Sequence, residues 1–266
     1  MIESSRSREA FEEARLGPLK LRNRVIKAAT FEGMTDGNTV RSELIEFHRR
    51  MAAGGVGMTT MAYIGVSPDG RGTPNELVPE ARHEADLKRL ADAVHQEGAA
   101  LSGQIGHAGA VAASAGLRGL SPSRLFSPIA LRRTQAMKSI DFPRVQEAFS
   151  ETSRRLVGCG FDAIEIHLGH GYLLSEFLSP HLNRRRDEWG GSLENRARFP
   201  RQVVEAVREA VGSDVAVLAK LNMADGVAGG LWVDESVRVA QMLEADGALD
   251  ALELTGGSSL QNPMYT

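Results

Sequence analysis

One pattern recurs along this chain: an amphipathic stretch ends at a glycine, and a short apolar run follows at once. It occurs at 52–62, 95–104, 157–166, 210–220 and 244–254. Glycine just past a helix end readily takes the left-handed conformation that closes the helix. The apolar runs are too short for helices and do not alternate cleanly, as expected of strands covered on both faces. The pattern therefore predicts repeated helix–strand units around a buried parallel sheet.

The stretches that precede these runs have helical spacing. Apolar side chains at i, i+3, i+4 and i+7 are found at Leu87, Leu90, Ala91 and Val94. Residues 145–156 follow the same spacing, which places the apolar side chains on one face of a helix. We expect Ser192 and Asp234 to be helix N-caps. Pro200 lies inside the long stretch 193–211, so we expect a kink or a helix break near it.

The number of units points to a barrel. With 25–30 as the first strand, six strand–helix repeats follow one another, and no G-x-G-x-x-G motif follows that strand as in a Rossmann fold. A (β/α)8 TIM barrel is favoured, with its active site at the C-terminal ends of the strands. A complete barrel needs eight units, so we expect residues 1–266 to form one barrel domain that is truncated at its C-terminal end. The segment 105–142 is rich in Gly, Pro and Ser and is expected to be a long loop or lid.

Composition narrows the class of protein. A net charge of −3 argues against a nucleic-acid or anionic-membrane partner. The single cysteine, Cys159, excludes an internal disulfide and suits a reducing cytosol. Residues 1–15 lack the apolar core of a signal peptide, and no run approaches the roughly 18 apolar residues of a membrane span. We expect a soluble, cytoplasmic protein without membrane contact. A contact in a homo-oligomer fits the segment 105–142 almost as well as a lid does.

Two histidines, His167 and His170, lie three positions apart at the end of the fourth predicted strand. They could be satisfied polar residues, two ligands of a metal in a barrel hydrolase, or two N–H donors for an oxygen that gains negative charge. A catalytic zinc needs a third protein ligand. The softest candidate, Cys159, precedes the strand and lies about 25 Å away. Tyr172 adds a phenol that is protonated at pH 7. An inactive barrel fragment is a further alternative, and the spacing alone leaves these readings open.

A longer motif covers the histidine pair. Residues 167–199, HLGHGYLLSEFLSPHLNRRRDEWGGSLENRARF, resemble the signature of the old yellow enzyme family of FMN-dependent ene-reductases. Shorter matches lie at 21–30, 67–72, 103–109 and 218–222. The resemblance runs from about Leu16 to the end of the chain and stops short of the family's last two barrel units. It implies an NADH:flavin oxidoreductase with FMN across the barrel mouth and NADH or NADPH as electron donor.

The resemblance also implies cofactor-binding residues. The flavin ring would contact Ala29, Thr30 and Ala62, and Gln104 would hydrogen-bond its pyrimidine edge. Lys220 would face the N1/O2 edge, where a fixed cation stabilises the negative charge of a reduced flavin. The FMN phosphate would bind after the seventh and eighth strands, which this sequence does not contain.

For catalysis, the resemblance implies that His167 and His170 bind the carbonyl or nitro oxygen of an unsaturated substrate. After NAD(P)H has reduced FMN, the substrate would take a hydride from the flavin at its β-carbon. Tyr172 would then deliver a proton to the α-carbon. No metal takes part in this interpretation.

Overall fold

A computed structural model describes residues 9–113 and 116–260. Residues 1–8, which belong to the stretch 1–15 in which we expect no signal peptide, lie outside the described residues. Six strands form one sheet in the order β12-β11-β10-β5-β4-β3, and every neighbouring pair in it is parallel. The strands are β3 (Ile26–Lys27), β4 (Met58–Gly65), β5 (Ala100–Gly106), β10 (Ala163–Leu168), β11 (Ala216–Asn222) and β12 (Ala251–Thr255). Each lies beside its predecessor in the chain, and all six predicted strands are confirmed.

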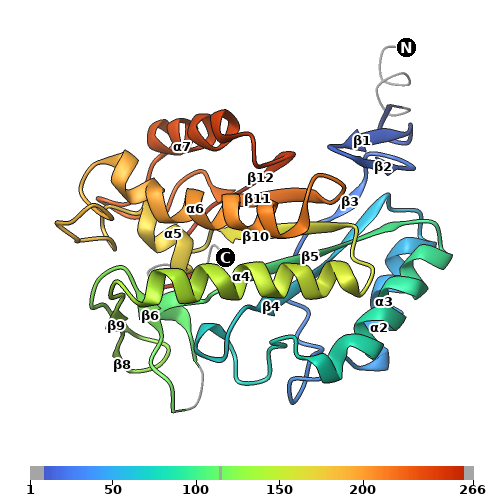
Figure 1. The fold of residues 1–266 in the computed structure, drawn as a ribbon, viewed down its shortest axis with the longest axis horizontal. Helices are drawn as coiled ribbons and strands as arrows, with labels where there is room; N and C mark the ends of the chain where they lie inside the picture. Colours follow the sequence, from blue (N-terminus) through green and yellow to red (C-terminus); the bar gives the residue numbers. More distant parts are fainter. Residues whose placement is uncertain (1–8, 114–115, 261–266) are drawn as a thin grey trace.

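Helices connect consecutive strands of this sheet and flank it (Figure 1). The α-helices are α2 (Ser42–Ala53), α3 (Glu84–Gln96), α4 (Asp141–Gly158), α5 (Leu173–Leu178), α6 (Leu193–Val211) and α7 (Val233–Asp246). The described part of the chain also contains the short 3-10 helices η1 (Pro68–Gly70), η2 (Ala81–His83) and η3 (Gly109–Val111). The architecture is a curled parallel half-barrel, a partial (β/α)8 barrel. In the part of the chain that the structure describes, no helix has the length and apolarity that a membrane span requires.

The helix ends follow the expectations in part. Ser192 caps α6, because its hydroxyl accepts the N–H of Asn195. Asp234 is not an N-cap: Trp232 holds that position, and Asp234 lies in the first turn of α7, where a carboxylate favours the helix dipole. Of the two outcomes expected at Pro200, a kink or a helix break, the break is wrong, since α6 runs unbroken through it.

Packing explains why α6 tolerates its proline. An interior proline costs a helix about 3 kcal/mol. The buried face of α6 includes Phe199, Val203 and Val207, all fully buried in the main core. Burying side chains of this kind contributes about 1.5–3 kcal/mol each, which outweighs the local penalty.

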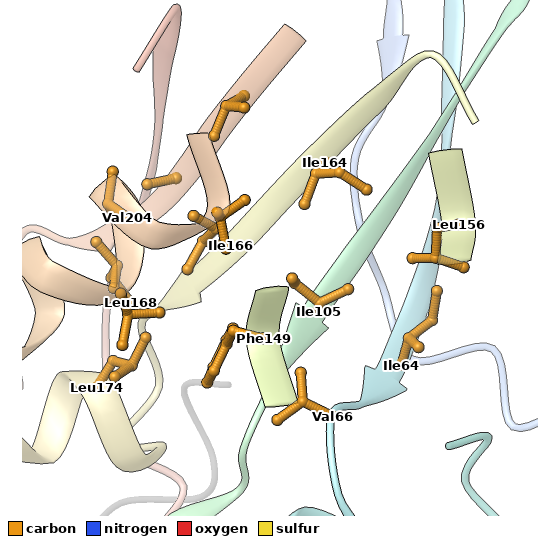
Figure 2. Packing of buried hydrophobic residues seen from close by; sticks show 14 of the residues in the cluster. Ile64, Val66, Ile105, Phe149, Leu156, Ile164, Ile166, Leu168, Leu174 and Val204 are labelled. Atoms are coloured by element: carbon orange, nitrogen blue, oxygen red, sulfur yellow. The ribbon is translucent and has the colours of Figure 1, made fainter. Parts of the chain in front are cut away.

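Alternation along the strands separates two environments. Figure 2 shows Ile164, Ile166 and Leu168 of β10 in the apolar cluster that the helices cover, with Phe149 of α4 and Val204 of α6. The intervening residues of β10 point to the opposite face, the inside of the barrel. At the bottom of that interior a second apolar cluster is formed by Leu21, Met58, Ala100, Ala163, Ala216 and Leu218. Inward-pointing residues that follow this cluster along each strand therefore lie inside the barrel, nearer its C-terminal mouth.

Two parts of the fold were not expected. An antiparallel hairpin, β1 (Ala14–Leu16) and β2 (Leu19–Leu21), packs its leucines against the bottom cluster. The segment 105–142 is more structured than a loop. It holds β6 (Leu120–Ser121), β7 (Phe126–Ser127), β8 (Arg132–Arg133) and β9 (Gln135–Ala136). These strands pair as β6 with β9 and β7 with β8. A lid role for this segment stays a prediction.

Candidate active site

Strand register brings polar side chains together inside the barrel. In β10 and β5, Glu165 is level with Gln104. In β10 and β11, His167 is level with Lys220, which is in turn level with Glu253 of β12. These side chains point to the same side of the sheet as the bottom apolar cluster, and they lie nearer the C-terminal ends of their strands. The mouth of the half-barrel is consequently lined with titratable groups that have little access to water.

A cavity of about 480 Å³ opens above these groups. Its lining residues are Ala29, Thr30, Phe31, Tyr63, Gly72, Thr73, Glu76, Gln104, Val111, His167, His170, Tyr172 and Ser259. Six of the eight predicted site residues are among them. Ala62 and Lys220 are not: both are buried behind the cavity wall.

Lys220 lies beneath the wall in a buried charge network. Its Nζ is 2.8 Å from Glu253 Oε1 and 3.7 Å from Glu165 Oε1, and it donates a hydrogen bond to Ala29 O at 3.2 Å. Gln104 Nε2 donates to Glu165 Oε1 at 2.5 Å. Burial raises the pKa of Glu165 to about 8, its hydrogen bond with Glu253 acts in the same direction, and Lys220 opposes both. The lysine thus compensates an acidic pair and fixes the backbone of Ala29 at the cavity.

The two histidines lie together but differ in their partners. Their ring centroids are 4.9 Å apart. His170 Nε2 is 2.6 Å from Thr255 Oγ1, and its backbone N–H donates to Asn222 Oδ1 at 3.0 Å. His167 Nδ1 is buried and has no hydrogen-bond partner among the described residues. The reading of both as satisfied polar residues therefore holds for His170 but not for His167.

Both imidazoles are neutral at pH 7. Burial lowers the pKa of His167 well below its usual value, and its electrostatic interactions with His170 and Lys220 lower it further. Burial and then Lys220 lower the pKa of His170 to about 4. A neutral imidazole has one N–H donor and one acceptor nitrogen. The pair can therefore donate to a substrate oxygen without carrying charge of its own.

Tyr172 completes the group that the sequence predicted. Its ring packs edge-on against His167, with centroids 4.9 Å apart, and against Tyr63 at 5.3 Å. Burial, and then the charge of Glu76, raise the pKa of Tyr172 well above its usual value. The phenol is thus held protonated over the whole physiological range and can act as a proton donor.

Tyr63 and Glu76 were missed by reasoning from the sequence. Tyr63 directly follows Ala62, but β4 continues to Gly65 rather than ending at 62, so the cavity-facing position is one residue later. The Tyr63 hydroxyl is buried and has no partner among the described residues. Glu76 lies between β4 and α3, on the side of the sheet where barrel enzymes keep their sites. That loop position was the signal that could have found it.

No third metal ligand accompanies His167 and His170 among the described residues. Within residues 9–113 and 116–260, no group of three or more His, Cys, Asp or Glu side chains could hold a metal ion. Cys159 is buried next to the C-terminal end of α4 and borders a different hollow, between α3 and α4. That hollow is lined by ion-paired surface residues such as Arg155 and Glu84 and lies away from the strand ends.

A parallel half-barrel that gathers these side chains at the C-terminal ends of its strands has the layout of a barrel enzyme. The sequence matches the NADH:flavin oxidoreductase / NADH oxidase family over residues 9–254. The chain belongs to this family, and the resemblance to old yellow enzymes is confirmed.

Three known proteins illustrate the relationship. The chain is 55% identical over 257 residues to a 4,4'-dithiodibutanoate disulfide reductase of Rhodococcus erythropolis, covering 96% of this chain and 64% of that protein. A 2-naphthoyl-CoA reductase in complex with 2-naphthoyl-CoA has a similar structure, with a TM-score of 0.89, 30% identity, and coverage of 94% and 41%. Morphinone reductase in complex with tetrahydroNAD has a TM-score of 0.83, 27% identity, and coverage of 92% and 73%. The chain thus spans about two thirds or less of the first two relatives.

Proposed function

We propose that this protein is an FMN-dependent oxidoreductase that passes a hydride from NADH or NADPH to an activated C=C bond of an enone, enal or nitroalkene. The observation that carries the proposal is the meeting of His167, His170 and Tyr172 at one cavity, two neutral N–H donors beside a protonated phenol. Membership of a flavin oxidoreductase family supports the redox half of the reaction.

The residues present fit FMN. The cavity wall contains the backbone around Ala29 and Thr30 and the side-chain amide of Gln104. The ammonium group of Lys220 lies directly behind Ala29. The unpartnered His167 Nδ1 is the kind of buried polar atom that a bound ligand satisfies. FMN, when bound, supplies a carrier that accepts a hydride from NAD(P)H and passes it to a substrate.

The substrate steps are assigned to the chain's own side chains. His167 and His170 hold the carbonyl or nitro oxygen and stabilise the negative charge that develops on it. Tyr172 protonates the α-carbon as the β-carbon receives the hydride. His167 is buried, and His170 and Tyr172 are half-buried, which limits water at the reacting atoms and strengthens these electrostatic contacts.

A second candidate is the reduction of an organic disulfide. It is favoured by the 55% identity to a protein named for reducing 4,4'-dithiodibutanoate. In that reaction a hydride cleaves the S–S bond, one sulfur leaves as a thiolate, and Tyr172 would supply its proton. The metal-dependent hydrolase interpretation has neither a third ligand among the described residues nor support from the family.

The experiment that separates these candidates uses anaerobic protein that has been reduced with NADPH. It is mixed with 2-cyclohexenone or with 4,4'-dithiodibutanoate, and reoxidation is followed at the flavin absorption band. Fast reoxidation by the enone supports the ene-reductase, and fast reoxidation by the disulfide alone supports the second candidate. If neither reoxidises the protein faster than buffer, both are rejected.

The remaining assignments concern location and partners. A cytoplasmic location is supported by the single, buried Cys159, which suits a reducing compartment. We assign small molecules as partners and no nucleic acid, in keeping with the net charge of −3. A homo-oligomer is supported by the apolar side chains exposed around β7 and β8, Phe126, Ile129 and Leu131. Light scattering of the purified protein tests the last point.

A further inference from the structure

Glu76 is a carboxyl group in the wall of the candidate substrate cavity. It is only 3% exposed, and it is the one acidic side chain among the described lining residues. Its own turn fixes it: Oε2 accepts the N–H of Gly72 at 2.6 Å, and its N–H donates to Thr73 O at 3.3 Å. Both of those residues line the cavity as well. The carboxyl is therefore presented to the cavity by local structure and not by an ion pair.

Glu76 has no ion-pair partner among the described residues. Among the described residues, no lysine, arginine or histidine lies within ion-pair distance of it, and Arg71 is the cation whose field reaches it. Tyr63 of β4 and Tyr172 face it from the other elements, and its charge raises the pKa of both phenols. The field of Glu76 thus extends to the side chain that is proposed to protonate the substrate.

The charge of this group varies close to neutral pH. Burial raises the pKa of Glu76 to about 7, against the opposing effect of the N–H donors of Gly72 and Thr73 and of Arg71. The two histidines of the cavity are neutral in this range, and both phenols stay protonated. Around pH 7, Glu76 is therefore the lining side chain whose ionisation changes the charge that a ligand meets.

We propose that Glu76 sets the charge preference of the substrate cavity. As a carboxylate it favours ligands with a cationic or hydrogen-bond-donating group near the two tyrosines and disfavours ligands with a carboxylate there. At a separation of about 6 Å and an effective dielectric constant of about 40, one charge changes an affinity about tenfold. The inference rests on the proposed function, because it takes this cavity as the substrate site, and it bears on the choice of substrate. A neutral enone is indifferent to Glu76, whereas a dicarboxylate such as 4,4'-dithiodibutanoate is penalised as the pH rises.

The test measures binding and not turnover. Three ligands of the same shape and different charge, benzamidine, benzamide and benzoate, are titrated into the FMN-loaded protein by calorimetry at pH 6, 7 and 8. Each ligand keeps its charge over this range. The variants are Glu76→Gln, whose amide oxygen can still accept the Gly72 N–H, and Glu209→Gln, an exposed glutamate on α6, as the matched control.

The proposal expects the benzamidine-to-benzoate affinity ratio to rise about tenfold or more between pH 6 and pH 8 in the unaltered protein and in Glu209→Gln. It expects a flat ratio in Glu76→Gln and unchanged benzamide affinity throughout. A ratio that does not depend on pH in the unaltered protein overturns the proposal without any variant. The same pH dependence persisting in Glu76→Gln, or no binding of any of the three ligands, overturns it too. The absorbance of bound FMN is recorded first, so that loss of the flavin site is distinguished from failure of the role of Glu76.

Discussion

At the scale of single residues, burial decides which protonation states the site offers. His167 and Tyr172 sit in contact, and the same loss of water makes the imidazole neutral and the phenol protonated. Two donors of different kinds thus face one cavity at pH 7. Their residue types could be predicted from the sequence, whereas the absence of a partner for His167 Nδ1 depends on the packed structure.

The first prediction concerns Tyr172. In Tyr172→Phe, reduction of the protein by NADPH keeps its rate, while reduction of an enone slows by about 10² to 10⁴-fold, the usual range for a general acid. Stopped-flow absorbance of the two half-reactions measures both rates. Full enone turnover in this variant would show that the proton comes from elsewhere.

A second prediction follows from the buried cation. Lys220→Met leaves Glu165 and Glu253 without their positive partner, so the free energy of unfolding falls by about 3 kcal/mol. Lys88→Met, which removes an exposed helix pair with Asp92, changes it by less than about 0.5 kcal/mol. Urea denaturation of both variants gives the comparison. Equal effects would mean that the network around Lys220 adds nothing to stability.

At the scale of helices and strands, local sequence rules predicted the helix ends and the strands that follow them, because local interactions determine these features. Glycines past the ends of α6 and α7, Gly212 and Gly247, take positive φ angles of 75° and 69°, and the strands follow them as expected. The helix break at Pro200 was wrongly expected because the packing of α6 lies outside any local rule. The hairpin of β1 and β2 was missed because its strands are three residues long and pack against distant strands.

The candidate site shows the same division. Residues at strand ends, such as Gln104, His167 and Lys220, could be predicted, because the strand pattern fixes their height and their face. Tyr63 and Glu76 were missed: the sequence shows that Glu76 follows a strand in a loop, but the place of both residues at the cavity depends on where β4 ends and on how that loop folds back. Loop conformation is a tertiary property, and the period of the sequence does not encode it.

A third prediction tests an element boundary. Ser192→Ala removes the hydroxyl that accepts the Asn195 N–H, so it lowers the free energy of unfolding by about 1 kcal/mol. Asp234→Ala in the first turn of α7 removes only a favourable dipole interaction, worth about 0.5 kcal/mol. Thermal denaturation ranks the two variants. The reverse order would contradict the cap assignments made here.

At the scale of the whole molecule, the sheet is open and many acids are buried. β12 lies at one edge of the sheet, and Leu254 on it is 61% exposed, unlike the apolar residues of the central strands. Burial raises the pKa of four carboxyls: Glu32 and Glu76 to about 7, Glu165 to about 8, and Glu176 well above its usual value. The folded state therefore holds protons that the unfolded chain has released.

The pH dependence of stability follows from those protons. Above pH 4.5 the unfolded chain has lost them, so stability falls as the pH rises towards the folded-state pKa values. Buried His48 and His167, with lowered pKa values, act in the opposite direction only below about pH 6.5. The fourth prediction is that stability falls from pH 6.5 to pH 8.

Glu176 contributes to that fall, because burial raises the pKa of its carboxyl well above the usual value. Glu176→Gln keeps an acceptor for the Ala110 N–H and should remove this share of the pH dependence. Chemical denaturation of both proteins at pH 6.5, 7.2 and 8 measures the slopes. Identical slopes would place the Glu176 carboxyl in a more polar environment than the structure does.

The central claim is that the mouth of this half-barrel is a flavin site, and a visible absorption spectrum tests it most directly. The purified protein is titrated with FMN, passed through a desalting column and then reduced with NADPH under anaerobic conditions. A flavin site predicts a retained flavin band that bleaches on reduction and is weakened in Lys220→Met. A colourless protein that retains none of the added FMN would contradict it.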